Sequence, residues 1–399
     1  MLAMVMNYIA LVCALLSALL AFIFFAEIAA SSLLRLKMNR AESANAWPHS
    51  LAVVVPAHNE STGLIPTISD IRSQLRPNDR LLVVADNCTD DTAAVARAAG
   101  AEVVERHDAD RRGKGFALDF GLRALLAQPP DVVVFVDADC RIAPGSIAQL
   151  SSVCRTSGRP VQALNLCYSP ENSEVNHQIA EFAMRVKNWL RPQGLAKLHL
   201  PCQLGGTGMA FPWQALQSVE LASGQIVEDL KLGLDLALAG TPPVFCEAAR
   251  ITSEFPASVT AANVQRSRWE HGHVDMILSA APRYLAISLV RRNLGLFALV
   301  LDMAVPPLVL LGFAIIAAWL MALAAYFFDG FVAPLTIASS TVALFVTALV
   351  MAWVRCGRDV LPPASLLSIV PYVVGKLRLH SRLPLAGSHS AWIRTDRKK

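Results

Sequence analysis

Three long apolar segments dominate the pattern of the chain. No charged side chain occurs in residues 1–26, 303–328 or 330–354. At about 1.5 Å per residue, each segment forms a helix of roughly 35 to 40 Å, enough to cross a hydrocarbon core of about 30 Å. The pattern therefore predicts an N-terminal transmembrane helix over 1–30 and a transmembrane helical hairpin over 303–354, with its turn at Asp329 and Gly330.

The residues that flank these segments predict how the chain lies in the membrane. The first segment lacks a basic start, is too long for a signal-peptide core and has no convincing cleavage site, so we interpret it as an anchor. Arg35, Lys37 and Arg40 follow it, and a basic tail at 355–399 follows the third segment. Cationic flanks stay on the cytoplasmic side. We expect a multi-pass protein of the inner (plasma) membrane, with a cytoplasmic middle domain and C-terminus and a possible interfacial helix in the tail.

Between the spans, short aliphatic runs alternate with helical patterns. The runs at 51–55, 81–85, 101–105 and 131–136 read as strands, and 62–74, 89–99 and 114–127 read as helices. A further strand at 161–166 and helices at 174–190 and from Val227 onward complete the pattern. Such alternation predicts an α/β domain over 41–283 whose mainly parallel sheet is covered on both faces.

The stretch 284–301 is apolar but contains Arg291 and Arg292. Each arginine costs about 2.5 to 3.5 kcal/mol at the centre of a membrane span, so we predict a helix that lies in the membrane interface. Asp302 follows directly. We expect it to reach water near a helix end, and we assign it no role.

Composition narrows the possible functions. The chain is 54% hydrophobic and 17% charged, and its net charge of +4 lies mostly at the membrane flanks. We interpret that charge as topology and contact with anionic lipid, and we expect no nucleic-acid partner. The eight cysteines form no C-x-x-C pair, which argues against a zinc site and fits reduced cytosolic thiols.

Polar clusters follow the first, second and fourth predicted strands, where ligands bind in open α/β sheets. They read "PAHNES", "DNCTDDT" and "DADC". No G-x-G-x-x-G motif follows the first predicted strand. A phosphate-binding P-loop is also missing, since the sequence Gly113, Lys114 and Gly115 lacks the upstream glycine of that motif. Asp139, with Asp137 beside it, could instead bind Mg²⁺ or Mn²⁺ and so neutralise a diphosphate. Taken alone, D-x-D is equally compatible with solvated acids at a strand end.

The combination of motifs is more specific than any one of them. Five motifs occur in one order between the membrane segments, from about residue 51 to 269. They are "PAHNES", "DNCTDDT", the D-x-D, the pair Glu228 and Asp229, and the sequence "QRSRW". In this the chain resembles the membrane-bound family 2 glycosyltransferases, which include cellulose, hyaluronan and chitin synthases and bacterial exopolysaccharide and glycolipid enzymes. The resemblance implies a single Rossmann-like nucleotide-sugar (GT-A type) domain.

The resemblance also implies roles for individual residues. Asp139 would bind the metal, Asp229 would be the general base, and Arg268 would stabilise the leaving diphosphate. The donor nucleotide sugar, expected to be a UDP-sugar, would contact Ala57, Asn59, Glu60, Asp86, Asn87, Lys114 and Asp137. The acceptor would contact Gly206, Thr207, Gly208, Glu228, Gln265 and Trp269. Val227 stands where the family has threonine, which weakens any statement about how that loop is anchored.

Simpler readings of these motifs remain open. "VEDL" could be an acidic helix start favoured by the helix dipole, Trp269 could anchor the chain at a membrane interface, and "GGTG" could be a plain turn. His271 and His273 do not match a metal-binding helix motif, and we treat them as structural or interfacial residues and not as metal ligands.

The predicted activity is inverting transfer of a sugar to a lipid-linked or glycan acceptor at the membrane, in exopolysaccharide, cell-envelope glycan or glycolipid synthesis. Inversion is implied by the family, through one base and direct displacement. A processive polysaccharide synthase is the first alternative, ranked second because three spans offer little wall for a polymer channel. A catalytically silent membrane scaffold and a transporter are alternatives of other classes.

Overall fold

The computed structural model describes residues 2–34, 49–170, 173, 175–222, 227–256 and 258–368. These fall into two units. A sheet unit takes the described residues of 49–173 and 200–299, and a helical unit takes those of 2–34, 175–199 and 300–368. The basic tail from residue 369, and Arg35, Lys37 and Arg40, lie outside the described residues, so the predictions made for them stay predictions.

The sheet unit is built on one sheet of eight strands in the order β3-β2-β1-β4-β7-β6-β8-β5. Four of the seven neighbouring pairs are parallel, so the sheet is mixed but mainly parallel, as predicted. The strands are β1 (Leu51–Ala57), β2 (Arg80–Asp86), β3 (Glu102–Arg106), β4 (Val132–Phe135), β5 (Arg141–Ile142), β6 (Val161–Tyr168), β7 (Met209–Pro212) and β8 (Val244–Glu254).

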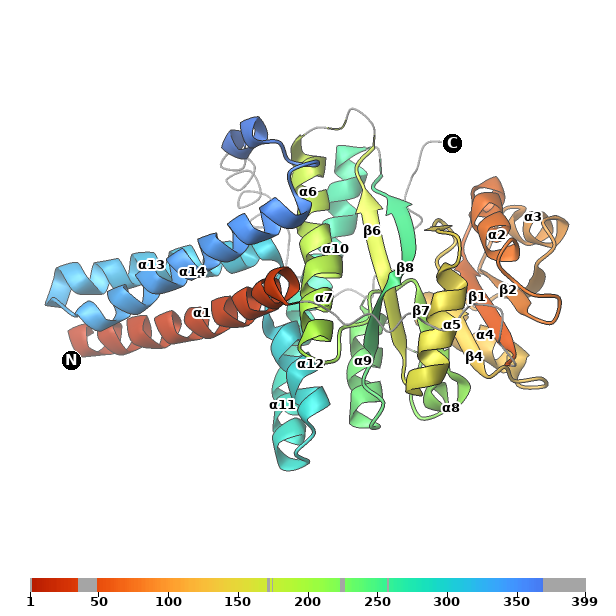
Figure 1. Ribbon diagram of the computed structural model, residues 1–399, viewed down its shortest axis with the longest axis horizontal. Helices are drawn as coiled ribbons and strands as arrows, with labels where there is room; N and C mark the ends of the chain where they lie inside the picture. Colours follow the sequence, from red (N-terminus) through yellow and green to blue (C-terminus); the bar gives the residue numbers. More distant parts are fainter. Residues whose placement is uncertain are drawn as a thin grey trace. The chain divides into compact units, whose positions relative to one another are not determined.

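Helices cover both faces of this sheet (Figure 1). The helices of the sheet unit are η1 (Ser61–Leu64), α2 (Ile65–Arg72), α3 (Thr92–Ala98), α4 (Lys114–Leu125), α5 (Ser146–Ser157), α8 (Trp213–Leu216), α9 (Glu228–Leu238), α10 (Val259–Ser279) and α11 (Ala281–Val290). Strand β1 is buried along its whole length. Its Val53 packs in one core with Ile68 of α2 and Ile147 of α5, while its Val54 packs in the other with Leu118 of α4 and Leu232 of α9. This alternation puts α4 and α9 on the same face.

The helical unit contains three helices that are long and apolar enough to cross a membrane, as predicted: Met4–Leu33, Leu308–Asp329 and Val332–Cys356. The unit comprises α1 (Leu2–Leu33), α6 (Val175–Arg185), the π turn η2 (Val186–Leu190), α7 (Arg191–Lys197), α13 (Leu308–Asp329), α14 (Val332–Cys356) and η3 (Pro363–Ser368). Helices α1, α13 and α14 run side by side (Figure 1). The Phe24 and Phe345 rings of α1 and α14 lie 5.8 Å apart, and Gly330, at φ 66°, ends α13.

The stretch 284–301, expected as one interfacial helix, is divided between two helices. Helix α11 ends at Val290, and α12 (Leu294–Ala304) begins after a break at 291–293. Arg292 adopts φ 51°, which ends the first helix, and the Asn293 side chain accepts a hydrogen bond from the Leu296 amide at 2.9 Å, which caps the second. Residues of α12 up to Leu299 belong to the sheet unit and the rest to the helical unit.

The expectation that Asp302 reaches water is wrong. Asp302 is 6% exposed and accepts a hydrogen bond from Arg191 at 2.5 Å, and Arg191 donates another to Glu27 at 2.5 Å. All three side chains belong to the helical unit. The sequence hides this triad, because Glu27, Arg191 and Asp302 are far apart along the chain and each stands beside apolar residues.

Candidate active site

Lys114 is the centre of the candidate site. It is the first residue of α4, and its Nζ atom lies 2.5 Å from Asp137 Oδ1, just after β4. The same Nζ donates a hydrogen bond to the Gly206 carbonyl at 2.6 Å and lies 4.0 Å from Glu228 Oε1, at the start of α9. Four segments that are distant in sequence therefore meet at one ammonium group.

The glycine-rich loop before β7 brings main-chain atoms close to this cluster. Gly206 has φ 80°, and a Cβ atom there would lie 3.4 Å from Asp229 Oδ2 and 3.6 Å from Lys114 Nζ. The Thr207 hydroxyl accepts a hydrogen bond from the Asp137 amide at 3.0 Å. Glycine suits position 206 because the backbone there is left-handed.

Charge in the cluster is unevenly balanced. Burial lowers the pKa of Lys114, but Asp137 and Glu228 outweigh burial and raise it above its ordinary value. Burial also raises the pKa of Asp137, and the charges of Asp139 and Asp229 raise it further against the opposing effect of Lys114. For Glu228, burial and the neighbouring Asp229 raise the pKa to about 8, although Lys114 lowers it. The site thus concentrates more carboxylate than one lysine neutralises.

Asp139 is held by a neighbour that the sequence analysis did not single out. The Cys140 thiol, 1% exposed, donates to Asp139 Oδ1 at 3.6 Å and lies 3.5 Å from the Thr207 hydroxyl. Cys140 therefore links the second acid of D-x-D to the glycine-rich loop.

The donor atoms suit a divalent cation shared with a substrate. Within the described residues, no group of three or more His, Cys, Asp or Glu side chains could hold a metal ion alone. Mg²⁺ in phosphate chemistry uses one or two carboxylates together with phosphate oxygens and water. Asp139 with Asp137, in a cluster that carries excess negative charge, fits that mode.

Helix α10 supplies the remaining predicted residues. Arg268 is partly buried, its Nε atom makes no hydrogen bond in the described part of the chain, and burial lowers the pKa of its guanidinium while Glu228 raises it. Glu228 is thus its electrostatic neighbour. Gln265 and Trp269 are also partly buried on α10. Their roles toward an acceptor stay predictions.

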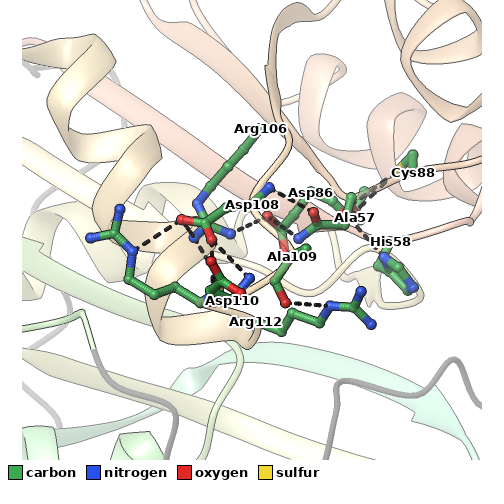
Figure 2. A network of polar contacts seen from close by, with 11 residues as sticks. Ala57, His58, Asp86, Cys88, Arg106, Asp108, Ala109, Asp110 and Arg112 are labelled. Carbon is green, nitrogen blue, oxygen red and sulfur yellow. Dashed lines mark hydrogen bonds and ion pairs between the residues drawn. The ribbon is translucent and has the colours of Figure 1, made fainter.

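A second group of predicted residues meets at the ends of β1, β2 and β3 (Figure 2). Asp86 is 1% exposed, and its Oδ1 atom accepts hydrogen bonds from Arg106 at 2.6 Å and from the Asn87 amide group at 3.1 Å. Arg106 also donates to the Arg111 carbonyl at 2.6 Å. Asp86 is therefore fixed in position, together with the loop that leads to Lys114.

The loop after β1 is tied to the same group. His58 Nδ1 lies 2.7 Å from the Asp86 carbonyl oxygen, beside Ala57 (Figure 2). The Asn59 side chain accepts a hydrogen bond from the Thr89 amide at 2.7 Å, and the Glu60 amide donates to the Thr92 hydroxyl at 2.8 Å. The predicted donor residues from the first two strands thus form one connected edge.

Arg106 is the main residue that the sequence analysis missed. It is the last residue of β3. The reasoning that picked out the ends of the first, second and fourth strands applies equally to the third, and "RHDADRRGK" carries the polar pattern. Reading that strand end in the same way would have found it.

Comparison with known proteins identifies the family. Residues 48–272 match the model of the glycosyltransferase like family 2. The chain belongs to this family. The matched range contains the lysine and carboxylate cluster, the Asp86 group and Arg268, so the predicted family is confirmed.

Individual relatives of this family 2 member cover short parts of it. Glucosyl-3-phosphoglycerate synthase of Mycobacterium tuberculosis is 41% identical over 98 residues, which is 23% of this chain and 29% of that protein. Protein RfbJ of Shigella flexneri is 32% identical over 90 residues, 23% of this chain and 64% of RfbJ. The chain therefore spans less than a third of the synthase that it matches.

A solved structure shares the fold over most of both chains. The mannosyltransferase PcManGT from Pyrobaculum calidifontis, solved with GDP-Man and Mn²⁺, aligns with 86% of this chain and 99% of its own, with a TM-score of 0.54 and 16% identity. At that identity the likeness is one of fold. It confirms the GT-A type α/β fold expected for this family 2 chain.

Proposed function

We propose that this protein is a metal-dependent inverting glycosyltransferase that moves a sugar from a nucleotide sugar to an acceptor at the membrane. The observation that carries the proposal is the meeting of Lys114, Asp137 and Asp229 at Gly206, on the edge of the sheet where the parallel strands end. A silent scaffold would not need to hold a lysine, a D-x-D pair and a second acidic pair together.

The donor lies across two groups of residues in this proposal. Asp86, oriented by Arg106 and Asn87, contacts the base of the nucleotide, and the Asn59 and Glu60 loop borders the nucleoside. Lys114 faces the diphosphate. Asp137, which pairs with Lys114, contacts the ribose or the donor sugar. UDP is the nucleotide we favour.

The leaving diphosphate needs compensating positive charge. Asp139, with Asp137, would hold Mg²⁺ or Mn²⁺, which supplies charge neutralisation to the diphosphate. Arg268 adds a guanidinium whose Nε atom has no protein partner in the described structure. Groups placed for the charge that develops as the bond breaks contribute most to the rate.

Asp229 is placed to act as the general base. The Leu230 amide donates to its Oδ1 atom at 2.9 Å, while Oδ2 lies on the side of Gly206. As the acceptor oxygen attacks the anomeric carbon, its proton moves to Asp229, and the bond to the diphosphate breaks on the opposite face. One displacement of this kind inverts the anomeric centre. The loop at 206–208, with Glu228, Gln265 and Trp269, borders the acceptor.

The three apolar helices favour an acceptor that is itself in the membrane, a lipid-linked sugar or a growing glycan. We propose the inner membrane, with the sheet unit and the C-terminus in the cytoplasm, from the basic residues that flank the spans. The product would serve exopolysaccharide, cell-envelope glycan or glycolipid synthesis. A processive synthase is the second candidate. It ranks below single addition because a chain with three spans would need an oligomer or a partner to build a polymer channel.

The test uses purified full-length protein in lipid nanodiscs. A panel of nucleotide sugars, with and without Mn²⁺, is assayed for release of nucleoside diphosphate in the presence of a membrane lipid extract, and products are identified by mass spectrometry. We expect one sugar class to turn over with the metal and not in EDTA. Asp229→Asn is the control for catalysis by this site. Failure of every donor to react and of UDP to bind would contradict the proposal.

A further inference from the structure

The turn between α11 and α12 forms an apolar and basic tip on the sheet unit. Leu289, Val290 and Leu294 are 60%, 85% and 78% exposed, values that are unusual for large aliphatic side chains. Arg291 and Arg292 lie between them and are also exposed. The tip therefore combines insertable side chains with two positive charges.

This tip is connected to the helix that carries the proposed base. The Tyr284 hydroxyl of α11 donates a hydrogen bond of 2.5 Å to Asp235 of α9. The Asn293 amide group, in the turn itself, donates to the Ala237 carbonyl near the end of α9 at 2.8 Å. Helix α11 and the turn that follows it are thus each bonded to the helix that begins with Glu228 and Asp229.

A third bond connects α12 with the segment before the glycine-rich loop. Gln203, two residues before Gly205, donates to the Leu299 carbonyl of α12 at 2.7 Å. In addition, a Cβ atom at Gly295 would lie 3.1 Å from the Pro242 ring, so α12 packs closely on the segment after α9. Helix α12, which begins at the tip, thus contacts the segments that lead into the glycine-rich loop and out of α9.

We propose that the tip docks on an anionic lipid surface, and that docking stabilises the α9 arrangement needed for transfer. This rests on the proposed function and extends it to regulation by the composition of the membrane. Two arginines among exposed aliphatic side chains complement acidic headgroups above acyl chains. Arg292 stands sixteen positions before α13 begins at Leu308, so the tip is close in sequence to a candidate span. A protein partner is the other possible occupant and is an outcome of the test.

Direct contact is tested first, independently of activity. A diazirine amino acid at position 290 of the full chain is irradiated in vesicles of phosphatidylcholine with and without phosphatidylglycerol. We expect cross-linked phospholipid, enriched in phosphatidylglycerol. The diazirine amino acid placed at position 320, an exposed position on α13, is the control. It should cross-link to phospholipid with no preference for phosphatidylglycerol. Cross-links only to protein, or none at 290 while 320 reacts, would overturn the docking surface.

Coupling is tested by turnover in the same two membranes. Phosphatidylglycerol should raise the turnover of the wild type by about fivefold, at the lower end of typical coupling between sites. Arg291→Gln with Arg292→Gln should abolish that rise, whereas Arg123→Gln with Arg155→Gln, which removes the same charge elsewhere, should keep it. Tyr284→Phe should keep the cross-link at 290 but lose the rise.

Each result of the coupling test decides the matter. An equal rise in all variants would overturn the role of the tip, and a full rise in Tyr284→Phe would overturn its route to α9. An enzyme without any turnover would contradict the proposed function while leaving the lipid cross-link as evidence for docking.

Discussion

Arg191 and Glu27 form an ion pair of 2.5 Å in the interior of the helical unit, with side chains 9% and 3% exposed. The pair joins α7 to α1, and Arg191 extends it to Asp302. Close packing accompanies it, since a Cβ atom at Gly194 would overlap the Glu27 carbonyl oxygen. Glycine at this position lets α7 lie directly on the backbone of α1.

Replacing Arg191 by Met should destabilise the protein strongly. Two carboxylates would remain buried without a cation, a change that typically costs about 3 to 5 kcal/mol. Thermal unfolding of the protein in nanodiscs measures the effect. A triple variant that adds Glu27→Gln and Asp302→Asn should recover much of the loss. Equal melting temperatures of Arg191→Met and wild type would show that the triad does not stabilise the fold.

Asp229→Asn should separate chemistry from binding. We expect turnover to fall by about 10²- to 10⁴-fold, the usual contribution of a general base, with UDP affinity nearly unchanged. Glu228→Gln is the matched control. The pKa of Glu228 is about 8, so most of this side chain is already protonated at pH 7 and glutamine resembles it. Equal impairment of the two variants would argue that Asp229 is structural.

The raised pKa of Glu228 also predicts how stability depends on pH. Unfolded, this carboxyl has an ordinary pKa of 4.5, while in the folded protein it is about 8. Between these values the folded state binds the extra proton, so the contribution of Glu228 to stability falls as pH rises from about 4.5 to 8 and then levels off. Melting temperatures of wild type relative to Glu228→Gln should follow this course. A constant difference between pH 5 and 8 would be inconsistent with a protonated Glu228.

Arg106→Met should weaken UDP binding by roughly 10- to 100-fold, because Asp86 would lose a charge-assisted hydrogen bond while staying buried. Arg97→Met is the control, since Arg97 pairs with Glu105 at an exposed site, where such pairs contribute about 0 to 1 kcal/mol. Titration calorimetry with UDP compares the variants. Similar affinities in both would remove Arg106 from the donor site.

Asp139→Asn should remove most activity and weaken the metal-dependent part of UDP binding, without unfolding the protein. Calorimetry with UDP, in Mn²⁺ and in EDTA, measures that part. Asp119→Asn, on the outer side of α4 and paired with Arg123, is the control for loss of one acid. Activity of Asp139→Asn at the wild-type level would rule out the metal role.

Local patterns in the sequence predicted the elements that consist of continuous runs of hydrophobic side chains. The apolar spans and strands β1, β2 and β4 are continuous hydrophobic runs, so their positions were found, and the parallel order placed Asp86 and Asp137 at one edge of the sheet. Strands β5, β7 and β8 were not predicted. β5 has only two residues, β7 lies within a glycine-rich motif, and β8 contains the partly buried Glu247 and the exposed Arg250.

Contacts between distant segments were beyond local patterns. The bond from Lys114 to the Gly206 carbonyl joins residues 92 positions apart, and the pair of Arg191 with Glu27 joins residues 164 apart. Nothing in the sequence around Arg191 indicates a buried partner, because both carboxylates that pair with it are far away along the chain. The break at 291–293 depends on the backbone of Arg292 and on the cap by Asn293, which hydrophobicity does not encode.

The helical unit is assembled from three separate lengths of chain. Asp302, which bonds Arg191 of α7, is synthesised only after residues 200–299 of the sheet unit. During translation, Arg191 therefore emerges long before its second carboxylate. The same arrangement bears on attempts to produce a soluble enzyme. Cutting the chain at residue 49 and before α13 would leave Phe182, Val186 and Leu190 without the residues of α1 and α14 that cover them. A fragment that keeps every proposed active-site residue would then carry an uncovered apolar face and aggregate.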